Sequence, residues 1–493
     1  MTSASEYFPT DAFLAGNPEF KDCWKPAKKV LAFWERTPLQ DFVPPHSPDV
    51  ALKFVAFRNP EASDAVLVVP GFNEPMLKYV QVAYELYVSG FSVFVYDHRG
   101  QGLSDRELQV QAEGRHQNGH IEDFFATKVA DCVAFARGVV VPGHRRVHLL
   151  AHSMGGLVAA HANHEAPDLF HKGRVVFSAP MFETVWGKIP PGGLPRKVSN
   201  AIGAFGVHLG LGRRLPPLPG AVLDWWDPHA PIFELLSHDK RKLAWYHALR
   251  SANPTLALLG PTMGWIYECT GAQYALEDKK VASTFANPTL ILTAETDSFV
   301  KASAQEAFCA AAPSCRRVVV KGAYHEVLFE SEDIRVACVD AVVNWFRQKG
   351  HSGDASTIGI SPSQPQEQYG GGSVPPAAKE KATTAARENI QEAGRKKFAE
   401  MQQQKGGSEQ QQPEAAAAKA PPVVQSIGGV RATLTGVLEL VQTSDVDTSF
   451  QPARSAQARA KRNGDAQRTL LVATAVVGAA TAAVLVRSKI GRR

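Results

Sequence analysis

The chain has 493 residues, of which 44% are hydrophobic and 20% are charged. This length and composition are typical of a globular enzyme with one large core and additional segments outside it. The formal net charge of +5 is carried by the C-terminal end, since residues 451–493 contain nine Lys or Arg and a single Asp. The rest of the chain is therefore slightly acidic, which argues against a nucleic-acid-binding protein and favours a basic tail that meets acidic lipid headgroups.

Cysteine spacing and the N-terminal residues bear on the cellular compartment. The six cysteines form no CxxC pair and no Cys/His spacing typical of a metal site, so we expect reduced thiols. The first 30 residues contain charged side chains and no uninterrupted apolar run, which argues against a secretory signal peptide. We therefore expect the folded body to face the cytosol. The cysteines are Cys23, Cys132, Cys269, Cys309, Cys315 and Cys338.

Between about residue 50 and residue 348, short apolar runs alternate with helical patterns, which is typical of a mostly parallel sheet covered by helices. Residues 183–285 are rich in Pro, Gly and Trp and interrupt this alternation, so we predict an inserted, mainly helical cap. The α/β core then comprises residues 51–182 and 286–348, after an N-terminal extension of residues 1–50. The predicted helices cover residues 77–89 and 124–139, and the predicted strands cover residues 53–57, 65–69, 92–96, 147–150, 175–178, 289–293 and 317–321.

The C-terminal part of the chain has a different composition. Residues 349–468 are dominated by Gly, Ser, Pro, Gln and Ala. Such a segment cannot bury enough apolar surface to fold compactly, so we expect a disordered low-complexity linker with short helices at most. Residues 469–486 contain no charge and are flanked by Arg468 and Arg487. At about 1.5 Å per residue this stretch just spans a bilayer core of roughly 30 Å, so we predict a C-terminal transmembrane tail anchor. A buried or amphipathic helix is the alternative.

A nucleophile pattern follows the strand predicted at residues 147–150. Residues 147–156 read VHLLAHSMGG, in which an apolar strand leads through Ser153 into a helical pattern. A sharp strand-to-helix turn of this kind is the nucleophile elbow of the α/β-hydrolase fold, and small residues such as Ala151 and Gly155 permit its strained backbone. The helix N-terminus behind the serine favours developing negative charge. We therefore predict that Ser153 is a catalytic nucleophile.

Two further residues complete a catalytic triad in the chain order of nucleophile, acid and histidine. A serine hydroxyl becomes a good nucleophile when an imidazole accepts its proton, and a carboxylate fixes the tautomer of that imidazole. Asp297 lies just after the strand predicted at residues 289–293, and His325 lies just after the last predicted strand. We predict that Asp297 is the acid and that His325 is the base. Glu295, two residues earlier on the same loop, is the competing acid.

The transition state also needs hydrogen-bond donors for the oxyanion, and the loss of one such donor typically costs about 3 to 4 kcal/mol. The backbone N–H of Met154 follows the nucleophile directly. The backbone N–H of Phe72 lies in the segment VPGF of residues 69–72, just after the second predicted strand, where this fold supplies its other donor. We predict that both amides bind the oxyanion.

Four segments together resemble the bacterial lysophospholipases and the related monoacylglycerol lipases. They read DHRGQGLS at residues 97–104, AHSMGG at residues 151–156, GPT at residues 260–262 with Trp265, and KGAYHEVLFE at residues 321–330. The resemblance spans roughly residues 50–348. It implies an α/β-hydrolase with a lipid-binding cap and with neither a metal nor another cofactor. It also implies that Ser153, Asp297 and His325 act as nucleophile, acid and base.

The expected reaction is a two-step acyl transfer. Ser153 attacks the ester carbonyl of a single-chain lipid such as a lysophospholipid, His325 accepts the hydroxyl proton, and water then releases the fatty acid. A monoacylglycerol lipase or a general carboxylesterase is the nearest alternative, and a catalytically inert tail-anchored scaffold is the alternative of another class. We expect apolar walls for one acyl chain from the cap, although the same side chains would equally form the core of the cap. The expected wall residues are Phe182, Trp186, Ile202, Phe205, Leu209, Leu211, Trp225 and Trp226.

The expected partners are the lipid ester and, through residues 469–486, an intracellular membrane. The short basic end of the chain favours the mitochondrial outer membrane, with the catalytic domain on the cytosolic side. Nucleic acid is not expected as a partner. The headgroup, the acyl length and the oligomeric state do not follow from the sequence.

Overall fold

A computed structural model describes residues 2–108, 116–118, 124–170, 172–185, 195–216, 233–256, 258–277 and 279–348. The linker predicted at residues 349–468 and the transmembrane helix predicted at residues 469–486 lie outside these ranges. Among the helices of the described ranges, none has both the length and the apolar character that crossing a bilayer requires.

An eight-stranded sheet lies at the centre of the described residues, in the order β1-β2-β4-β3-β6-β7-β9-β10. The pairs β1–β2 and β2–β4 are antiparallel, and every further pair is parallel. The seven strands predicted from the sequence are all present, with bounds within two residues of their predictions. The strands are β1 (Gln40–Phe42), β2 (Leu52–Phe57), β3 (Asp64–Val69), β4 (Ser92–Tyr96), β6 (Arg146–His152), β7 (Val175–Ser178), β9 (Thr289–Ala294) and β10 (Cys315–Val320).

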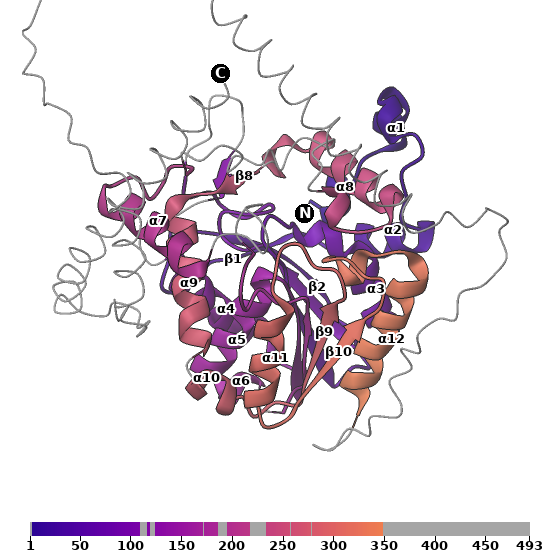
Figure 1. The fold of residues 1–493 in the computed structure, drawn as a ribbon. Helices are drawn as coiled ribbons and strands as arrows, with labels where there is room; N and C mark the ends of the chain where they lie inside the picture. The colour runs from indigo at the N-terminus through magenta and orange to yellow at the C-terminus, as the bar shows by residue number, and fades with distance from the viewer. Residues whose placement is uncertain are drawn as a thin grey trace, which may run out of the picture. The chain divides into compact units, whose positions relative to one another are not determined.

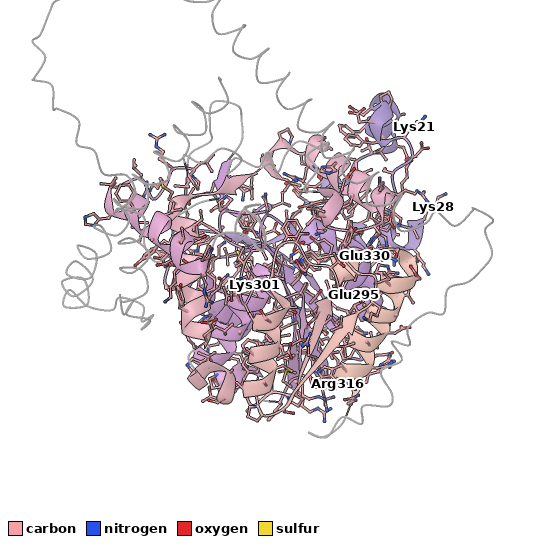
Figure 2. All side chains as sticks on the ribbon, in the orientation of Figure 1. Lys21, Lys28, Glu295, Lys301, Arg316 and Glu330 are labelled. Carbon is pink, nitrogen blue, oxygen red and sulfur yellow. A yellow bond between two sulfur atoms is a disulfide. The ribbon has the colours of Figure 1, made fainter. Side chains whose placement is uncertain are left out.

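The parallel strands share one direction, so their carboxyl ends meet at one edge of the sheet. Figure 2 shows Arg316, at the start of β10, near the bottom of the ribbon, and Glu295, just after β9, above it. Strands β3, β4, β7 and β9 are buried along their whole length, as expected for apolar runs covered on both faces. Loops that follow these strands are therefore brought together at one edge, which is where ligands bind in open α/β sheets.

Helices cover both faces of the sheet. Helix α3 (Val80–Val88) and helix α12 (Glu332–Arg347) lie on one side in Figure 1, while α4 (Phe124–Phe135), α5 (Met154–Glu165) and α11 (Ala302–Ala311) lie on the other. Apolar side chains from both layers and from the sheet form one continuous core. This arrangement confirms the α/β architecture predicted from the alternation of strand and helix patterns.

Both helices predicted from the sequence are present. The helix predicted at residues 77–89 begins with a 3-10 turn at Met76–Tyr79 and continues as α3. The helix predicted at residues 124–139 is α4, extended by a π-helical turn at Ala136–Val140. The short helix α6 (Pro167–Phe170) follows α5.

The N-terminal extension packs on the core. It contains α1 (Asp11–Gly16), α2 (Lys28–Glu35) and the edge strand β1. Trp34 of α2 is fully buried, and its indole N–H donates to the carbonyl of Val80 at 2.9 Å. The partners in this contact are 46 residues apart in the sequence, so the local pattern of the first 50 residues did not reveal it.

The described residues of the predicted cap, residues 183–285, are mainly helical. Helix α7 (Arg196–His208) lies against α9 (Met263–Glu277), and a Cβ atom added to Gly203 would lie 2.8 Å from the Met263 carbonyl oxygen. Glycine at that position therefore permits the close approach of the two helices. The other described elements of this region are α8 (Lys240–Ala252), α10 (Lys279–Ser283), the 3-10 turns Phe233–Leu235 and Pro254–Leu256, and β8 (Leu258–Pro261). Strand β8 pairs in parallel with β5 (His116–Asn118), which lies outside the predicted cap.

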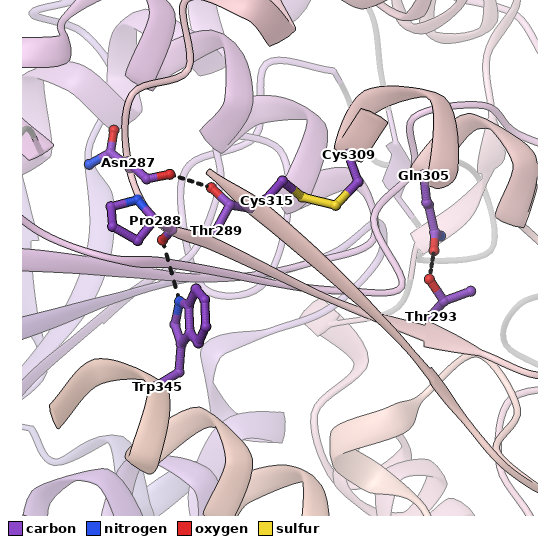
Figure 3. The surroundings of a disulfide bond; sticks show 8 residues. All are labelled: Asn287, Pro288, Thr289, Thr293, Gln305, Cys309, Cys315 and Trp345. Carbon is purple, nitrogen blue, oxygen red and sulfur yellow. Dashed lines mark hydrogen bonds between the residues drawn. A yellow bond between two sulfur atoms is a disulfide. The ribbon is translucent and has the colours of Figure 1, made fainter. Parts of the chain in front are cut away.

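The prediction that all six cysteines are reduced thiols is wrong for one pair. Cys309 and Cys315 form a disulfide, shown with its surroundings in Figure 3. Helix α11 ends at Ala311 and β10 begins at Cys315, so a short turn brings the two Cα atoms to 5.1 Å, within the range of about 4.4 to 6.8 Å typical of disulfides. A six-residue separation matches no common Cys motif, and the turn that closes it was not predicted. The cysteines that remain free thiols are Cys23, Cys132, Cys269 and Cys338, all buried.

Candidate active site

The turn between β6 and α5 has the geometry of a nucleophile elbow. Ser153 has a φ of 50°, in a region that costs a non-glycine residue of order 1 to 3 kcal/mol. The turn is held by hydrogen bonds from the Ser153 N–H to the Ser178 carbonyl at 3.1 Å and from the Met181 N–H to the Ser153 carbonyl at 2.9 Å. A Cβ atom on Gly155 would lie 2.2 Å from the Val69 carbonyl oxygen. Glycine is therefore required there for α5 to start so close to the sheet.

The structure brings Ser153, His325 and Asp297 together from three separate loops. The distance from Ser153 Oγ to His325 Nε2 is 3.0 Å, and the distance from His325 Nδ1 to Asp297 Oδ2 is 2.8 Å. The other carboxylate oxygen of Asp297 accepts the N–H groups of Phe299 at 2.8 Å and Val300 at 3.0 Å. With Nδ1 donating to Asp297, Nε2 is left to accept the serine proton, which is the arrangement that general-base catalysis requires.

The competing acid, Glu295, lies away from the histidine. Its carboxylate accepts hydrogen bonds from Lys321 Nζ at 2.6 Å and from the Gly322 N–H at 2.9 Å, and its side chain is 38% exposed. The hydrogen bond from Lys321 holds the pKa of this carboxyl below its usual value. Of the two acids considered from the sequence, Asp297 is therefore the one that contacts His325.

The two amides predicted to bind an oxyanion flank the elbow in the fold. Met154 is the first residue of α5, and the first N–H groups of a helix have no acceptor within the helix. Phe72 follows Gly71 in the loop after β3, and its ring lies 4.5 Å from the ring of Trp265. The carbonyl of Gly71 accepts a hydrogen bond from Gln101 Nε2 at 2.9 Å, which fixes this loop. Oxyanion binding by these amides stays a prediction.

A buried group of four charged or ionisable side chains lies next to the triad, and the sequence did not reveal it. We call it the site cluster: Glu74, Lys78, His152 and Glu326, none of which is more than 7% exposed. The ammonium of Lys78 contacts the carboxylates of both Glu74 and Glu326, and His152 Nε2 lies 3.3 Å from Glu326 Oε2. Burial alone lowers the pKa of His152, but the carboxylates of Glu326 and Glu74 raise it above its ordinary value. The only local signal was the four-residue spacing of Glu74 and Lys78.

The site cluster has the donor set of a metal site but does not fit a metal ion. The ligand atoms of Glu74, His152 and Glu326 lie within 4.8 Å of one another. The Lys78 ammonium, however, lies 2.6 Å from Glu326 Oε1 and is also bonded to Glu74. The chain thus supplies the positive charge that a metal ion would bring, and no step of the reaction needs to be assigned to a metal.

The residues expected to form acyl walls have different locations. Phe182 is 1% exposed and packs in the core, with ring-centroid distances of 4.6 Å to Phe308 and 5.4 Å to Phe177. Of the two positions expected for it, an acyl wall or a core, Phe182 therefore has the core position, because it lies among core rings. Leu209 and Leu211 are 50% and 42% exposed at the end of α7, while Ile202 and Phe205 are half-buried on that helix. The positions of Trp186, Trp225 and Trp226 lie outside the described residues.

Ser153 lies at a strained strand-to-helix turn and is hydrogen-bonded through His325 to Asp297, at the carboxyl edge of an α/β sheet. This arrangement defines a serine hydrolase of the α/β-hydrolase class. The family model described as "Serine aminopeptidase, S33" matches residues 60–332, more than half of the chain. The chain belongs to this family.

Two bacterial lysophospholipases are similar in sequence to this chain. The chain is 30% identical over 357 residues to lysophospholipase L2 of Escherichia coli K12, covering 68% of this chain and 97% of the relative. It is 29% identical over 311 residues to the probable lysophospholipase L2 of Haemophilus influenzae, covering 62% of this chain and 91% of the relative. Among solved structures, a soluble variant of monoglyceride lipase from Saccharomyces cerevisiae has a TM-score of 0.48 and 16% identity, over 63% of this chain and 94% of that one. The predicted resemblance to bacterial lysophospholipases is confirmed.

Proposed function

We propose that the protein is a serine carboxylic ester hydrolase that cleaves the ester of a single-chain lipid, a lysophospholipid in the first instance, through an acyl-serine intermediate. The observation that supports this most directly is the hydrogen-bonded chain from Ser153 through His325 to Asp297, at 3.0 and 2.8 Å. The relatives named lysophospholipase L2 support the choice of a lysophospholipid as substrate.

The reaction follows from the roles of the three side chains. His325 Nε2 takes the proton of Ser153 as the hydroxyl oxygen attacks the ester carbonyl, and Asp297 stabilises the imidazolium that forms. The amides of Phe72 and Met154 donate to the oxyanion of the tetrahedral intermediate. The imidazolium then protonates the leaving alcohol, and a water molecule activated by His325 releases the fatty acid from Ser153.

The first experiment asks whether Ser153 is a reactive nucleophile. We expect a fluorophosphonate probe to label the full-length protein in detergent and to leave the Ser153→Ala variant unlabelled. Asn163→Ala, a buried polar substitution elsewhere on α5, controls for general loss of folding and is expected to retain labelling. An unlabelled, folded wild-type protein would favour the inert scaffold instead.

The second experiment compares substrates on the same preparation. The panel contains lysophosphatidylcholine, a monoacylglycerol, a short-chain p-nitrophenyl ester and, because the family description names an aminopeptidase, an aminoacyl p-nitroanilide. We expect the highest kcat/KM with lysophosphatidylcholine. Preference for the monoacylglycerol would make the protein a monoacylglycerol lipase, and preference for the anilide would overturn the lipid assignment.

We further propose that residues 469–486 anchor the enzyme in an intracellular membrane, the mitochondrial outer membrane in the first instance, with the catalytic domain on the cytosolic side. The support is the uncharged stretch between basic flanks. The Cys309–Cys315 disulfide weighs against the cytosolic side, because disulfides are rare in reducing compartments. We expect the full chain in the carbonate-resistant membrane fraction and a chain ending at residue 468 in the soluble fraction. A soluble full-length chain would contradict the anchor, and a catalytic domain protected from added protease in intact organelles would contradict the orientation.

A further inference from the structure

We propose that Lys78 is a positioning residue, whose ammonium joins the oxyanion loop, the nucleophile elbow and the histidine loop through one buried ion cluster and balances the charge beside His325. The proposal rests on the proposed hydrolase reaction of Ser153 and His325, and it concerns residues that do not touch the substrate.

Each acidic or imidazole member of the site cluster lies within two residues of a group proposed for the reaction. His152 precedes Ser153, and Glu326 follows His325. Glu74 lies two residues after Phe72. The site cluster therefore links the three loops that the reaction needs, and Lys78 is the member that contacts more than one of them without belonging to any.

The Glu74 end of the site cluster holds the oxyanion loop. Glu74 Oε2 accepts the N–H of Gly71 at 2.6 Å and the hydroxyl of Tyr79 at 2.7 Å. A Cβ atom on Gly71 would lie 2.8 Å from the same carboxylate oxygen. The position of the backbone that leads into Phe72 thus depends on where the Glu74 carboxylate lies, and that carboxylate is bonded to Lys78.

The Glu326 end holds the other two loops. Glu326 Oε1 lies 2.6 Å from Lys78 Nζ, and Oε2 lies 3.3 Å from His152 Nε2. The other nitrogen of His152, Nδ1, lies 3.0 Å from the carbonyl oxygen of Ser178, the same carbonyl that accepts the N–H of Ser153. The N–H of Glu326 donates in turn to the Leu236 carbonyl at 2.9 Å. A shift of Glu326 would therefore move His152 and the backbone of His325 together.

Lys78 is buried, and its surroundings stabilise the charged ammonium. Its ammonium lies 5.1 Å from the ring centroid of Tyr246 and 5.2 Å from that of Phe329, in addition to its two carboxylate contacts. Burial alone lowers the pKa of Lys78, but Glu326 and Glu74 raise it above its ordinary value, so the side chain stays charged. Aromatic faces and carboxylates are the surroundings that stabilise a desolvated ammonium.

The charges of the site cluster balance when His152 is protonated, with two carboxylates against one ammonium and one imidazolium. The ring of His152 lies 4.9 Å from that of His325, so the cluster charge acts directly on the catalytic base. In the part of the chain that the structure describes, the other groups that face His325 are Asp297, at 2.8 Å, Ser153, at 3.0 Å, and the ring of Phe299, at 5.1 Å. Removal of the Lys78 charge leaves the site cluster with a net negative charge, which stabilises the protonated form of the His325 imidazole. A protonated His325 cannot act as the base, so activity at low pH is expected to fall.

The test measures the pH dependence of kcat/KM on a p-nitrophenyl ester with the full-length protein. We expect Lys78→Met to move the acid limb of the profile upward by on the order of one pH unit, and to lower kcat on the order of 10- to 100-fold because the loops lose their alignment. KM is expected to stay within about threefold, since no substrate contact is removed. Lys78→Arg keeps the charge and is expected to restore the wild-type acid limb.

A charge-balanced double variant separates the electrostatic role from a merely structural one. Lys78→Met with Glu326→Gln removes one charge of each sign, so we expect its acid limb to return to the wild-type position while kcat stays low. Lys128→Met controls for the loss of a buried lysine side chain, because Lys128 is also fully buried but donates to the Arg99 carbonyl at 2.7 Å and, within the described residues, makes no bond to the site cluster. Its acid limb is expected to match that of the wild type.

Two outcomes overturn the proposal: a folded Lys78→Met protein with an unmoved acid limb, or a double variant displaced as far as the single one. If Lys78→Met does not fold, Lys78→Gln takes its place, because the amide donates to a carboxylate while it removes the same charge. Wild-type protein that neither labels with fluorophosphonate nor turns over the ester contradicts the proposed function. If the wild type is active and the acid limb of the Lys78→Met profile does not move, only the proposed role of Lys78 is contradicted.

Discussion

Two ion clusters in the same fold, each with buried charges, differ in what lies next to them. The site cluster lies beside Ser153 and His325. A second group, which we call the lateral cluster, consists of the buried residues Arg99 and Asp131, the partly buried Glu107 and the exposed His46. Arg99 Nε and Nη2 donate to the two carboxylate oxygens of Asp131 at 2.5 and 2.7 Å, and both residues are 1% exposed. The remaining contacts of the lateral cluster are Arg99 Nη1 to Glu107 at 2.9 Å and His46 to Asp131 at 3.0 Å.

Burial of charge does not by itself indicate a role in the reaction. Both clusters need their partners, because a buried charge left alone typically costs about 3 to 5 kcal/mol. The lateral cluster ties the loop after β4 to helix α4, and none of its hydrogen bonds within the described residues reaches the triad. We therefore expect substitutions near the site to change the rate and substitutions in the lateral cluster to change the stability.

The largest effect is expected from Asp297→Asn, which changes a charge in direct contact with His325. An amide at this position stabilises the wrong tautomer and does not stabilise the imidazolium, so kcat is expected to fall on the order of 10⁴-fold. Steady-state rates on the p-nitrophenyl ester measure this loss, with fluorophosphonate labelling as a second readout. Retention of a tenth of the wild-type rate would show that Asp297 is not the acid that orients His325.

Local patterns made the triad predictable, whereas the clusters depend on distant partners. The elbow is a strand followed by small residues around Ser153, and Asp297 and His325 each follow a predictable strand at the carboxyl edge. The bond between Lys78 and Glu326 joins residues far apart in sequence, and the sequence offers no pattern that pairs them. The same holds for Trp34, which reaches Val80 across 46 residues. For Phe182 the sequence left an acyl wall and a core position equally open, because an apolar side chain suits both.

Asp131→Asn tests whether the lateral cluster contributes to stability and not to the rate. It leaves the Arg99 guanidinium without its bidentate partner, so the free energy of unfolding is expected to fall by about 3 to 5 kcal/mol. Denaturant unfolding measures this loss. The rate of the enzyme that remains folded, normalised to labelled Ser153, is expected to match the wild type. A large fall in that normalised rate would mean that the two clusters are coupled.

The contribution of Asp131 to the free energy of unfolding depends on pH. Burial raises the pKa of Asp131, but hydrogen bonds and charges from His46 and Arg99 lower it by a larger amount. The pKa of this carboxyl is therefore below its ordinary value. A carboxyl with a lowered folded-state pKa contributes stability above its unfolded pKa of about 4, and this stability is lost as the pH falls through the folded value. We expect Asp131→Asn to lose stability relative to the wild type at pH 7 and to approach it below about pH 4. A constant difference across that range would contradict this assignment.

Reduction of the disulfide is expected to have a smaller effect, confined to stability. Cys309 and Cys315 close a short loop at the start of β10, at the edge opposite the triad. Chain-entropy arguments give about 2 kcal/mol for a loop of this size. Paired unfolding curves with and without reductant measure the loss, and the Cys309→Ser, Cys315→Ser double variant serves as the control because reductant should not affect it. A changed kcat on reduction would show that loss of the disulfide alters the triad at the opposite edge of the sheet.

Glu295→Gln is expected to have the smallest effect, although Glu295 lies two residues from Asp297 on the same loop. Its carboxylate is bonded to Lys321 and Gly322 in contact with solvent, and ion pairs of this kind are screened by water and salt. We expect kcat/KM within about threefold of the wild type, against the loss of about four orders of magnitude for Asp297→Asn. Measuring both variants on one substrate makes the contrast quantitative. A loss of comparable size in Glu295→Gln would mean that the two carboxylates exchange roles in the working enzyme, and that distance to His325 in this structure does not identify the acid.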